Sequence, residues 1–217
     1  MAKGPKIGKL LLMSIAVIAS CLAAVWLWKG KDLSAWLNEQ PQGPEYVINN
    51  YGPDIKSVAT SKGLKTSYFM ALCMLECGGR KPAPSRYEKH IFNRLMDVKT
   101  GQRESYELVK TEDLKNANGS AIKNLASSWG PFQVMGYKVV AHGILIKELR
   151  GPNGVKHGID WIESEYGKLL QEDRFKDAFH FHNAGRVMPK KGGVRTHSKS
   201  YVSDGMKWMT YFEEQGY

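Results

Sequence analysis

One carboxylate stands at the end of an apolar run, directly before two glycines, in the stretch LCMLECGGR of residues 72–80. The run predicts a buried helix that Thr66 or Ser67 caps and that Gly78-Gly79 ends. Glu76 would then lie at the C-terminal end of this helix, where the macrodipole is negative and the surroundings are apolar. Both conditions oppose ionisation, so we expect the pKa of the Glu76 carboxyl to be raised.

A carboxyl group that stays protonated near neutral pH can act as a general acid. Such an acid protonates the leaving oxygen in glycoside cleavage, which makes Glu76 a candidate catalytic residue. The alternative is a glutamate whose side chain extends past the helix end to water. This stretch alone does not separate the two interpretations.

Several motifs occur in a fixed order after this helix. The series Glu76-Cys77-Gly78, GPFQVM at 130–135 and Asn183-Ala184-Gly185 resembles the goose-type lysozyme and lytic transglycosylase superfamily. RYEKHIFNRL at 86–95 and ASSWGPFQVMGY at 126–137 are similar to the N-acetylmuramidase domain of phages and bacteria. The resemblance runs from about residue 54 to the C-terminus. It implies a mostly α, lysozyme-like domain with Glu76 as the catalytic acid and peptidoglycan as the substrate.

The resemblance also assigns a sugar-binding groove. One set of residues matches the loop that lines it, a second set matches a pair that orients the acid and the substrate, and a third set matches the muramidase-specific segment. The residues that match the groove loop are Ser128, Trp129, Phe132, Gln133 and Met135. The pair that orients the acid and the substrate is His182 and Asn183. The muramidase-specific segment supplies Glu88 and His90.

Some of these positions have other interpretations. Trp129 and Phe132 are suited to stacking on sugar faces, but each could equally be a core residue. Glu88 could be an ordinary surface charge. Two positions depart from the family pattern, since Cys77 replaces a serine and His182 replaces a tyrosine.

The reaction itself stays open at this point. Hydrolysis of the β-1,4 bond between N-acetylmuramic acid and N-acetylglucosamine with inversion needs a second carboxylate. The candidates for it are Glu88, Asp97, Glu104 and Glu107. A lytic transglycosylase leaves a 1,6-anhydro end and needs no such partner. A third possibility, from another class, is a non-catalytic membrane anchor protein that binds peptidoglycan.

The N-terminus predicts a membrane segment. Residues 1–9 contain three lysines, and residues 10–28 contain no charge, which is enough to span a bilayer once. We expect a single-pass inner-membrane anchor at 10–28, a cytoplasmic basic N-terminus, a linker at 29–53, and the lysozyme-like domain at 54–217 in the periplasm. Residues 18–21 also resemble a lipoprotein processing box.

Three cysteines accompany this arrangement. Cys73 and Cys77 are four residues apart on one helix, so their β-carbons should be about 5–6 Å apart, too far for a disulfide. The N-terminus resembles that of signal-arrest-release endolysins, and in some of that group an anchor cysteine rearranges a disulfide that cages the active site. That resemblance implies a redox switch involving Cys21, Cys73 and Cys77. The alternative is two buried reduced thiols and one that faces lipid.

The net charge and the remaining motifs limit which binding partners and cofactors we expect. The net charge of +10 suits an anionic partner, and the basic stretch 186–199 would favour docking on the carboxylates or anionic polymers of the wall. This stretch has no aromatic residues for stacking on bases, so we expect no nucleic-acid partner. Other phage lysis or virion proteins are candidate partners if a phage encodes the chain. Cys-x3-Cys and His180-x-His182 do not have metal-site spacing, and no nucleotide-binding motif occurs, so we expect neither metal nor cofactor.

The coarse pattern predicts helices rather than strands. Helical spacing occurs at 138–149 and 159–171, within 174–186 before Gly185, and at 201–214. Asp54 could cap a helix that continues to about Ser61. Residues 97–120 read as loop with a short helix.

Overall fold

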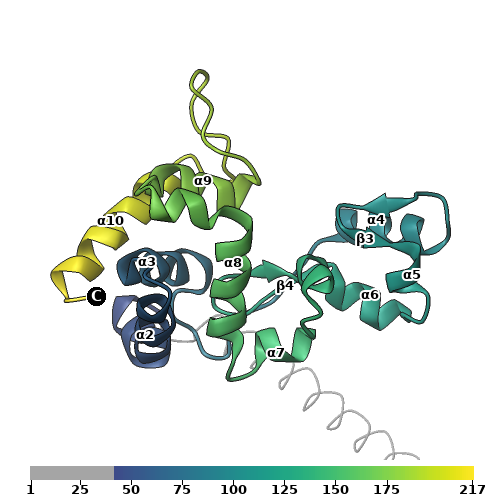
Figure 1. Ribbon diagram of the computed structural model, residues 1–217, viewed down its shortest axis with the longest axis horizontal. Helices are drawn as coiled ribbons and strands as arrows, with labels where there is room; N and C mark the ends of the chain where they lie inside the picture. Colours follow the sequence, from purple (N-terminus) through teal and green to yellow (C-terminus); the bar gives the residue numbers. More distant parts are fainter. Residues whose placement is uncertain (1–41) are drawn as a thin grey trace, which may run out of the picture. The chain divides into compact units, whose positions relative to one another are not determined.

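The computed structural model describes residues 42–217, and this part of the chain is mostly α-helical, as expected (Figure 1). Its α-helices are α2 (Pro44–Ser61), α3 (Thr66–Cys77), α4 (Lys89–Lys99), α5 (Thr111–Leu114), α6 (Gly119–Leu125), α7 (Ile146–Arg150), α8 (Gly154–Gln171), α9 (Phe175–Ala184) and α10 (Tyr201–Glu214). A 3₁₀ helix, η1, covers Gly136–His142.

Five short strands form two small antiparallel sheets that the sequence pattern did not reveal. β1 (Arg86–Tyr87), β4 (Ser127–Trp129) and β5 (Val134–Met135) form one sheet in that order, and β2 (Ser105–Tyr106) pairs with β3 (Val109–Lys110). Strands of two or three residues are too short to show a period of two, which explains why they escaped detection.

The main core surrounds α3. This helix packs against α10 and α2, and every residue from Ser67 to Cys73 is buried. Aromatic rings fill the space between α3 and α9, where the ring centroids of Tyr68 and Phe179 are 4.6 Å apart. The prediction of a central, buried helix is confirmed. Its C-terminal boundary is also confirmed, because Gly78 has a left-handed φ of 61°.

A second, smaller core belongs to the middle of the chain. The apolar face of α4 packs there against α5, α6 and the β2–β3 pair, with Leu95, Leu114 and Ile122 fully buried. Figure 1 shows α4, α5, α6 and β3 on one side of β4, and α2, α3, α9 and α10 on the other. The β1–β4–β5 sheet therefore lies between the two cores.

Several predicted helices are confirmed and others need correction. The segments 159–171 and 201–214 are helical, and Gly185 ends α9 with a φ of 67°. The segment 138–149 is not one helix, because η1 ends at Gly143, whose φ is 65°, before α7 begins. The N-terminal cap of α3 is Lys65, whose side chain makes no capping bond, rather than Thr66 or Ser67.

The predicted linker at 29–53 is wrong from residue 44 onward, since α2 begins at Pro44 and contains Asp54 in its interior. Proline is tolerated in the first turn, where no helical partner for its nitrogen exists. The buried face of Val47, Tyr51, Ile55 and Ala59 fixes this helix against α3.

The predicted membrane anchor, its basic flank, the start of the predicted linker and Cys21 lie outside the described residues. Within residues 42–217, no helix has the length and apolar character needed to cross a membrane.

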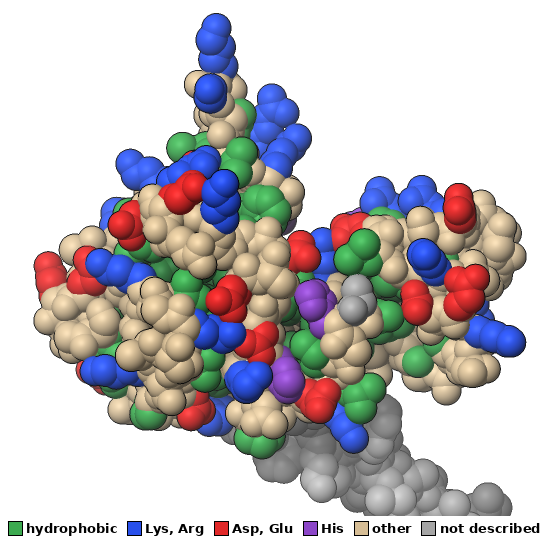
Figure 2. All heavy atoms as spheres, viewed as in Figure 1, with side chains coloured by type: hydrophobic (Ala, Val, Ile, Leu, Met, Phe, Trp, Pro, Cys, Tyr) green, Lys and Arg blue, Asp and Glu red, His purple; other side chains and the backbone are tan. Residues whose placement is uncertain are grey.

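The segment 186–199 between α9 and α10 is an extended loop that stands out from the neighbouring helices (Figure 1). Lys and Arg side chains gather on it (Figure 2).

Candidate active site

Hydrogen-bond donors on Gly43 and on α2 hold the C-terminal end of α3 in place, and this also positions Glu76. The amide of Gly43 donates to the carbonyl of Gly78 at 2.9 Å, and the Asn50 side chain donates to the carbonyl of Gly79 at 2.7 Å. The Tyr51 hydroxyl donates to the carbonyl of Arg80 at 2.8 Å. Carbonyl groups at and after the helix end therefore have partners, and the backbone beside Glu76 is held in place.

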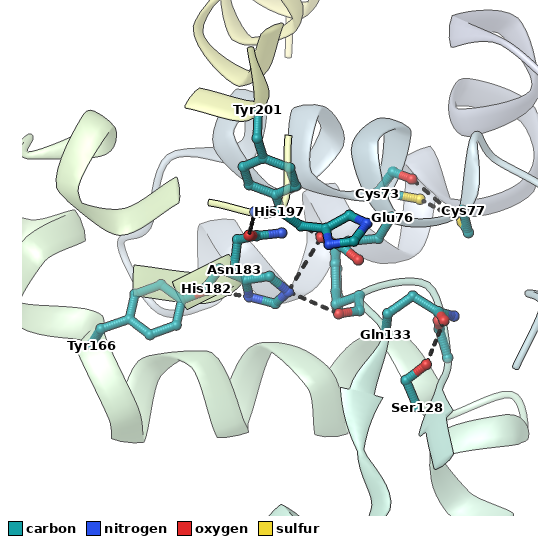
Figure 3. Close-up of polar contacts among 12 residues, drawn as sticks. Cys73, Glu76, Cys77, Ser128, Gln133, Tyr166, His182, Asn183, His197 and Tyr201 are labelled. Atoms are coloured by element: carbon teal, nitrogen blue, oxygen red, sulfur yellow. Dashed lines mark hydrogen bonds and ion pairs between the residues drawn. The ribbon is translucent and has the colours of Figure 1, made fainter. Parts of the chain in front are cut away.

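The Glu76 side chain is 16% exposed and points into a group of polar side chains (Figure 3). The Tyr201 hydroxyl, from the first residue of α10, donates to Oε1 of Glu76. Burial raises the pKa of Glu76 from 4.5 to about 7, although the Tyr201 hydrogen bond and the positive charge of Arg86 lower it. The predicted rise is confirmed, and the alternative of a side chain that extends into water is wrong.

His182 is the second group that faces Glu76. Its Nε2 lies 3.7 Å from Oε1 of Glu76 and 3.0 Å from the carbonyl oxygen of Phe132. A carbonyl oxygen only accepts, so Nε2 carries the hydrogen and Nδ1 accepts from the Tyr166 hydroxyl at 2.7 Å. The Tyr68 hydroxyl in turn donates to that of Tyr166 at 3.3 Å.

Burial lowers the pKa of His182 from 6.5 to about 4. His182 is therefore neutral wherever the Glu76 carboxyl is ionised, and the two groups do not form an ion pair. The neutral Nε2–H of His182 donates to the Phe132 carbonyl and lies beside the carboxyl group without a hydrogen bond to it. His182, at the position where the resembling family usually has a tyrosine, thus donates to Phe132 rather than to Glu76.

The loop between β4 and β5 is fixed by its own side chains. Ser128 Oγ donates to Oε1 of Gln133 at 2.7 Å, and Nε2 of Gln133 donates to the carbonyls of Pro84 and Gly130 at 2.6 and 3.0 Å. Gln133 holds a left-handed φ of 48°. These contacts give Ser128 and Gln133 a role in shaping the loop, whereas the sequence resemblance assigned them to substrate contact.

Strand register places three side chains in a row across the sheet. Arg86 pairs with Ser128, which pairs with Met135. Met135 is half-buried and packs against the second core. Arg86, which the sequence analysis did not single out, is thus adjacent to the predicted groove loop.

The two aromatic candidates differ in exposure. The Phe132 side chain is 1% exposed, and its ring lies against Phe69 and Gly158 in the main core. The prediction that Phe132 stacks on sugars is therefore wrong, because a ligand cannot reach the ring. Trp129 is half-buried; its Nε1 donates to the carbonyl of Asn124, and the Arg150 guanidinium lies 4.8 Å from its ring centroid.

The remaining predicted site residues do not contact Glu76. Asn183 Oδ1 accepts from the amide of His197 at 2.8 Å and so holds the loop after α9. Glu88 binds Nε of Arg86 at 2.9 Å and lies 3.6 Å from Nδ1 of His90, which is 63% exposed. Glu88 and His90 are thus linked to Glu76 through Arg86, whose positive charge lowers the pKa of Glu76.

No second carboxylate of residues 42–217 contacts Glu76. Glu107, one of the four candidates, accepts from the Tyr137 hydroxyl and pairs with Lys138, both beside the second core. Asp97 and Glu104 make no contact with Glu76 either, and the same holds for Glu88.

Three tyrosines of this network escaped the sequence analysis: Tyr68, Tyr166 and Tyr201. Tyr201 lies 125 residues from its partner Glu76, so no local pattern could link the two. Its position as the first residue of the last helix was visible in the sequence, but its partner was not.

The two cysteines of α3 are reduced and fully buried. Their Sγ atoms are 3.6 Å apart, and the Cys77 thiol donates to the carbonyl of Cys73 at 3.4 Å. The expectation that an intact helix does not bridge them is confirmed. Burial raises the pKa of the Cys73 thiol, which keeps it in its unreactive form.

Within the part of the chain that the structure describes, no three His, Cys, Asp or Glu residues gather in a way that could hold a metal ion.

Comparison with known proteins adds no relative: no protein family matches the chain, and neither a curated protein nor a solved structure is similar to it.

Proposed function

We propose that this protein is a peptidoglycan-degrading glycosidase in which Glu76 is the general acid. The observation that carries the proposal is a buried carboxyl group with a pKa of about 7, fixed at the end of α3 and held by Tyr201. The sequence resemblance to goose-type lysozymes and lytic transglycosylases supplies the substrate. The bond cut would be the β-1,4 link between N-acetylmuramic acid and N-acetylglucosamine.

The hydrogen bonds define which oxygen of Glu76 delivers the proton. Oε1 accepts from the Tyr201 hydroxyl, so the acidic proton of the neutral carboxyl belongs on Oε2. Transfer of that proton to the bridging oxygen leaves a carboxylate. Tyr201 already donates to this group, whereas the Nε2–H of His182, whose nitrogen lies 3.7 Å away, donates to the Phe132 carbonyl. The hydrogen bond from Tyr201 stabilises the charge that appears when the proton leaves.

A second candidate keeps the acid and changes the product. Hydrolysis with inversion uses a second carboxylate about 6.5–9.5 Å from the first to activate water. None of the described carboxylates contacts Glu76 or is among the groups that shift its pKa. A lytic transglycosylase needs no second carboxylate, because the substrate's own hydroxyl attacks and a 1,6-anhydro end forms.

The proposal places residues 10–28 in the inner membrane, with the lysozyme-like domain in the periplasm. Protease added to spheroplasts should then digest residues 54–217 without disrupting the membrane. Protection of the whole chain would contradict this topology.

Zymography on purified sacculi tests the catalytic role. Glu76→Gln keeps the size and the Tyr201 acceptor but has no proton to give, so we expect clearing to fall by at least about a thousandfold. Glu214→Gln, at the exposed end of α10, is the matched control and should clear like the wild type. Wild-type protein that binds sacculi and never clears them would favour the non-catalytic binder instead.

Mass spectrometry of the released muropeptides separates the two reactions. Reducing ends identify a hydrolase, and 1,6-anhydro ends identify a lytic transglycosylase.

A further inference from the structure

The segment 186–199 concentrates positive charge without compensation. It contains Arg186, Lys190, Lys191, Arg195 and Lys199 and no acidic residue. All five are exposed, and none forms a salt bridge with another residue of 42–217. This charge is therefore available to an external partner.

The base of this segment is firmly attached to α9. The buried His180 donates from Nδ1 to the carbonyl of Arg186 at 2.7 Å and accepts from the amide of Arg195 at Nε2, at 3.0 Å. Asp177 accepts from the amide of Met188 at 3.2 Å. One histidine thus ties both sides of the loop to the core. The loop is a supported projection with a fixed root, which lowers the ordering cost of binding.

The charges are spread along the projection and do not converge on one point. Lys190 and Lys191 precede the tip, where Gly192 and Gly193 adopt positive φ values of 93° and 73°. Arg186 and Arg195 flank the root, and the segment stands clear of the neighbouring helices (Figures 1 and 2). This distribution fits a linear polymer that carries repeated negative charges better than a single small anion.

The root of the segment adjoins the candidate active site. It begins four residues after His182 and ends two residues before Tyr201. Both of those side chains face Glu76. A polymer that is bound along the segment is consequently held beside the carboxyl group.

We propose that residues 186–199 form a cationic arm that binds the carboxylate-bearing strands of peptidoglycan and keeps the polymer at the site while Glu76 acts. The substrate class named here rests on the proposed function. The lack of aromatic side chains in the arm argues against single-stranded nucleic acid, which binds by stacking on aromatic rings.

Binding is tested without catalysis, with the full chain in non-ionic detergent and Glu76→Gln as the background. The arm variant combines Lys190→Gln, Lys191→Gln and Arg195→Gln. Its control combines Arg103→Gln, Lys115→Gln and Lys147→Gln, which removes the same charge from exposed positions outside the arm. Co-sedimentation with purified sacculi at 50 and 300 mM NaCl measures the affinity.

We expect the arm variant to bind sacculi about tenfold more weakly at the lower salt, with the control within about twofold of the parent. The difference should shrink at the higher salt because the charges are screened. Equal binding by the arm and control variants would overturn the proposal. A loss confined to anionic phospholipid vesicles, with sacculus binding intact, would also overturn it and identify a membrane surface as the partner.

Cleavage of a short oligosaccharide of alternating β-1,4-linked N-acetylglucosamine and N-acetylmuramic acid, with every lactyl carboxyl group converted to a neutral amide, separates this proposal from the proposed function. With Glu76 restored, the arm variant should cleave it at the wild-type rate, because the oligomer has no carboxylates. A wild-type protein that binds sacculi through the arm and cleaves nothing would refute the proposed function and leave the arm as a binding element.

Discussion

The pKa of Glu76 is the result of three opposing influences. Removal from water raises it, and this effect exceeds the hydrogen bond from Tyr201 and the charge of Arg86, which both lower it. Arg86 is 66% exposed and already paired with Glu88, so solvent and its partner weaken its field at the carboxyl group. Tyr201 is buried and donates directly to the carboxyl, so it is the stronger of the two.

Tyr201→Phe tests this balance at the level of one hydroxyl group. The substitution removes the donor that stabilises the carboxylate, so the pKa of Glu76 should rise above its value of about 7, by about one unit. The alkaline limb of the pH–rate profile should move upward, while the rate at its maximum falls because the carboxylate that forms after proton transfer has lost a donor. Wall digestion across pH 5–9 measures both.

Tyr211→Phe is the matched control, because Tyr211 lies on the same helix and its hydroxyl forms no side-chain hydrogen bond within residues 42–217. Its profile should equal that of the wild type. A limb that stays in place or moves to lower pH in Tyr201→Phe would show that Tyr201 does not control the acid.

Local features at the residue scale were predictable and distant ones were not. The raised pKa of Glu76 followed from its apolar neighbours and its place at a helix end, all within a few residues. Phe132 was misassigned because a family motif transfers residue type without the burial of the side chain, which here depends on Phe69 and Gly158. Tyr201 could not be found, since only the packing of α10 against α3 brings it to the carboxyl group.

At the scale of elements, the end of α3 depends on the beginning of α2. The backbone of Gly79 approaches that of Val47 so closely that a β-carbon on Gly79 would lie 2.3 Å from the Val47 nitrogen. This contact also explains why the sequence analysis missed the start of α2. Pro41, Gly43 and Pro44 suggest a loop by composition, but a helix there is fixed by burial against α3 rather than by its own propensity.

Gly79→Ala should therefore be much more damaging than a typical Gly→Ala change. Gly79 and Gly63 have left-handed φ values of 76° and 66°, so alanine is strained at both. A β-carbon on Gly63 meets no atom within 4 Å. We expect Gly63→Ala to lower the free energy of unfolding by about 1 kcal/mol and Gly79→Ala by at least about 3 kcal/mol, because α2 must also move away from α3.

Urea denaturation of the two variants measures the difference. Gly79→Ala should also lose more wall-digesting activity than its lower stability explains, because the backbone beside Glu76 shifts. Equal destabilisation by both substitutions would show that the contact with Val47 does not constrain the helix end.

Across the whole molecule, two buried groups couple protonation to folding in opposite directions. The folded state keeps a proton on Glu76 that the unfolded chain releases between pH 4.5 and about 7. Stability from this group is thus present at low pH and is lost as the pH rises through that range. His182 does the reverse: its folded pKa of about 4 lies below 6.5, so its contribution is present above pH 6.5 and is lost as the pH falls.

Each group contributes about 3 kcal/mol over its full range, so the two slopes cancel between about pH 4.5 and 6.5. Glu76→Gln removes the pH-dependent stability contribution of Glu76 and leaves that of His182. The free energy of unfolding in urea, measured from pH 4.5 to 8, tests this. The variant should gain about 3 kcal/mol relative to the wild type between the two ends of that range, because the wild type must hold a buried carboxylate at high pH. His182→Gln should change the slope with the opposite sign. Taking the difference between variant and wild type removes the titrations of all other groups.

A Glu76→Gln difference that is constant with pH would mean that Glu76 ionises like an exposed glutamate, and such a group could not serve as the proton donor of a glycosidase. A protein that becomes more stable when its candidate acid is neutralised would instead carry the expected mark of a functional site, where the charged state needed by the reaction opposes the fold.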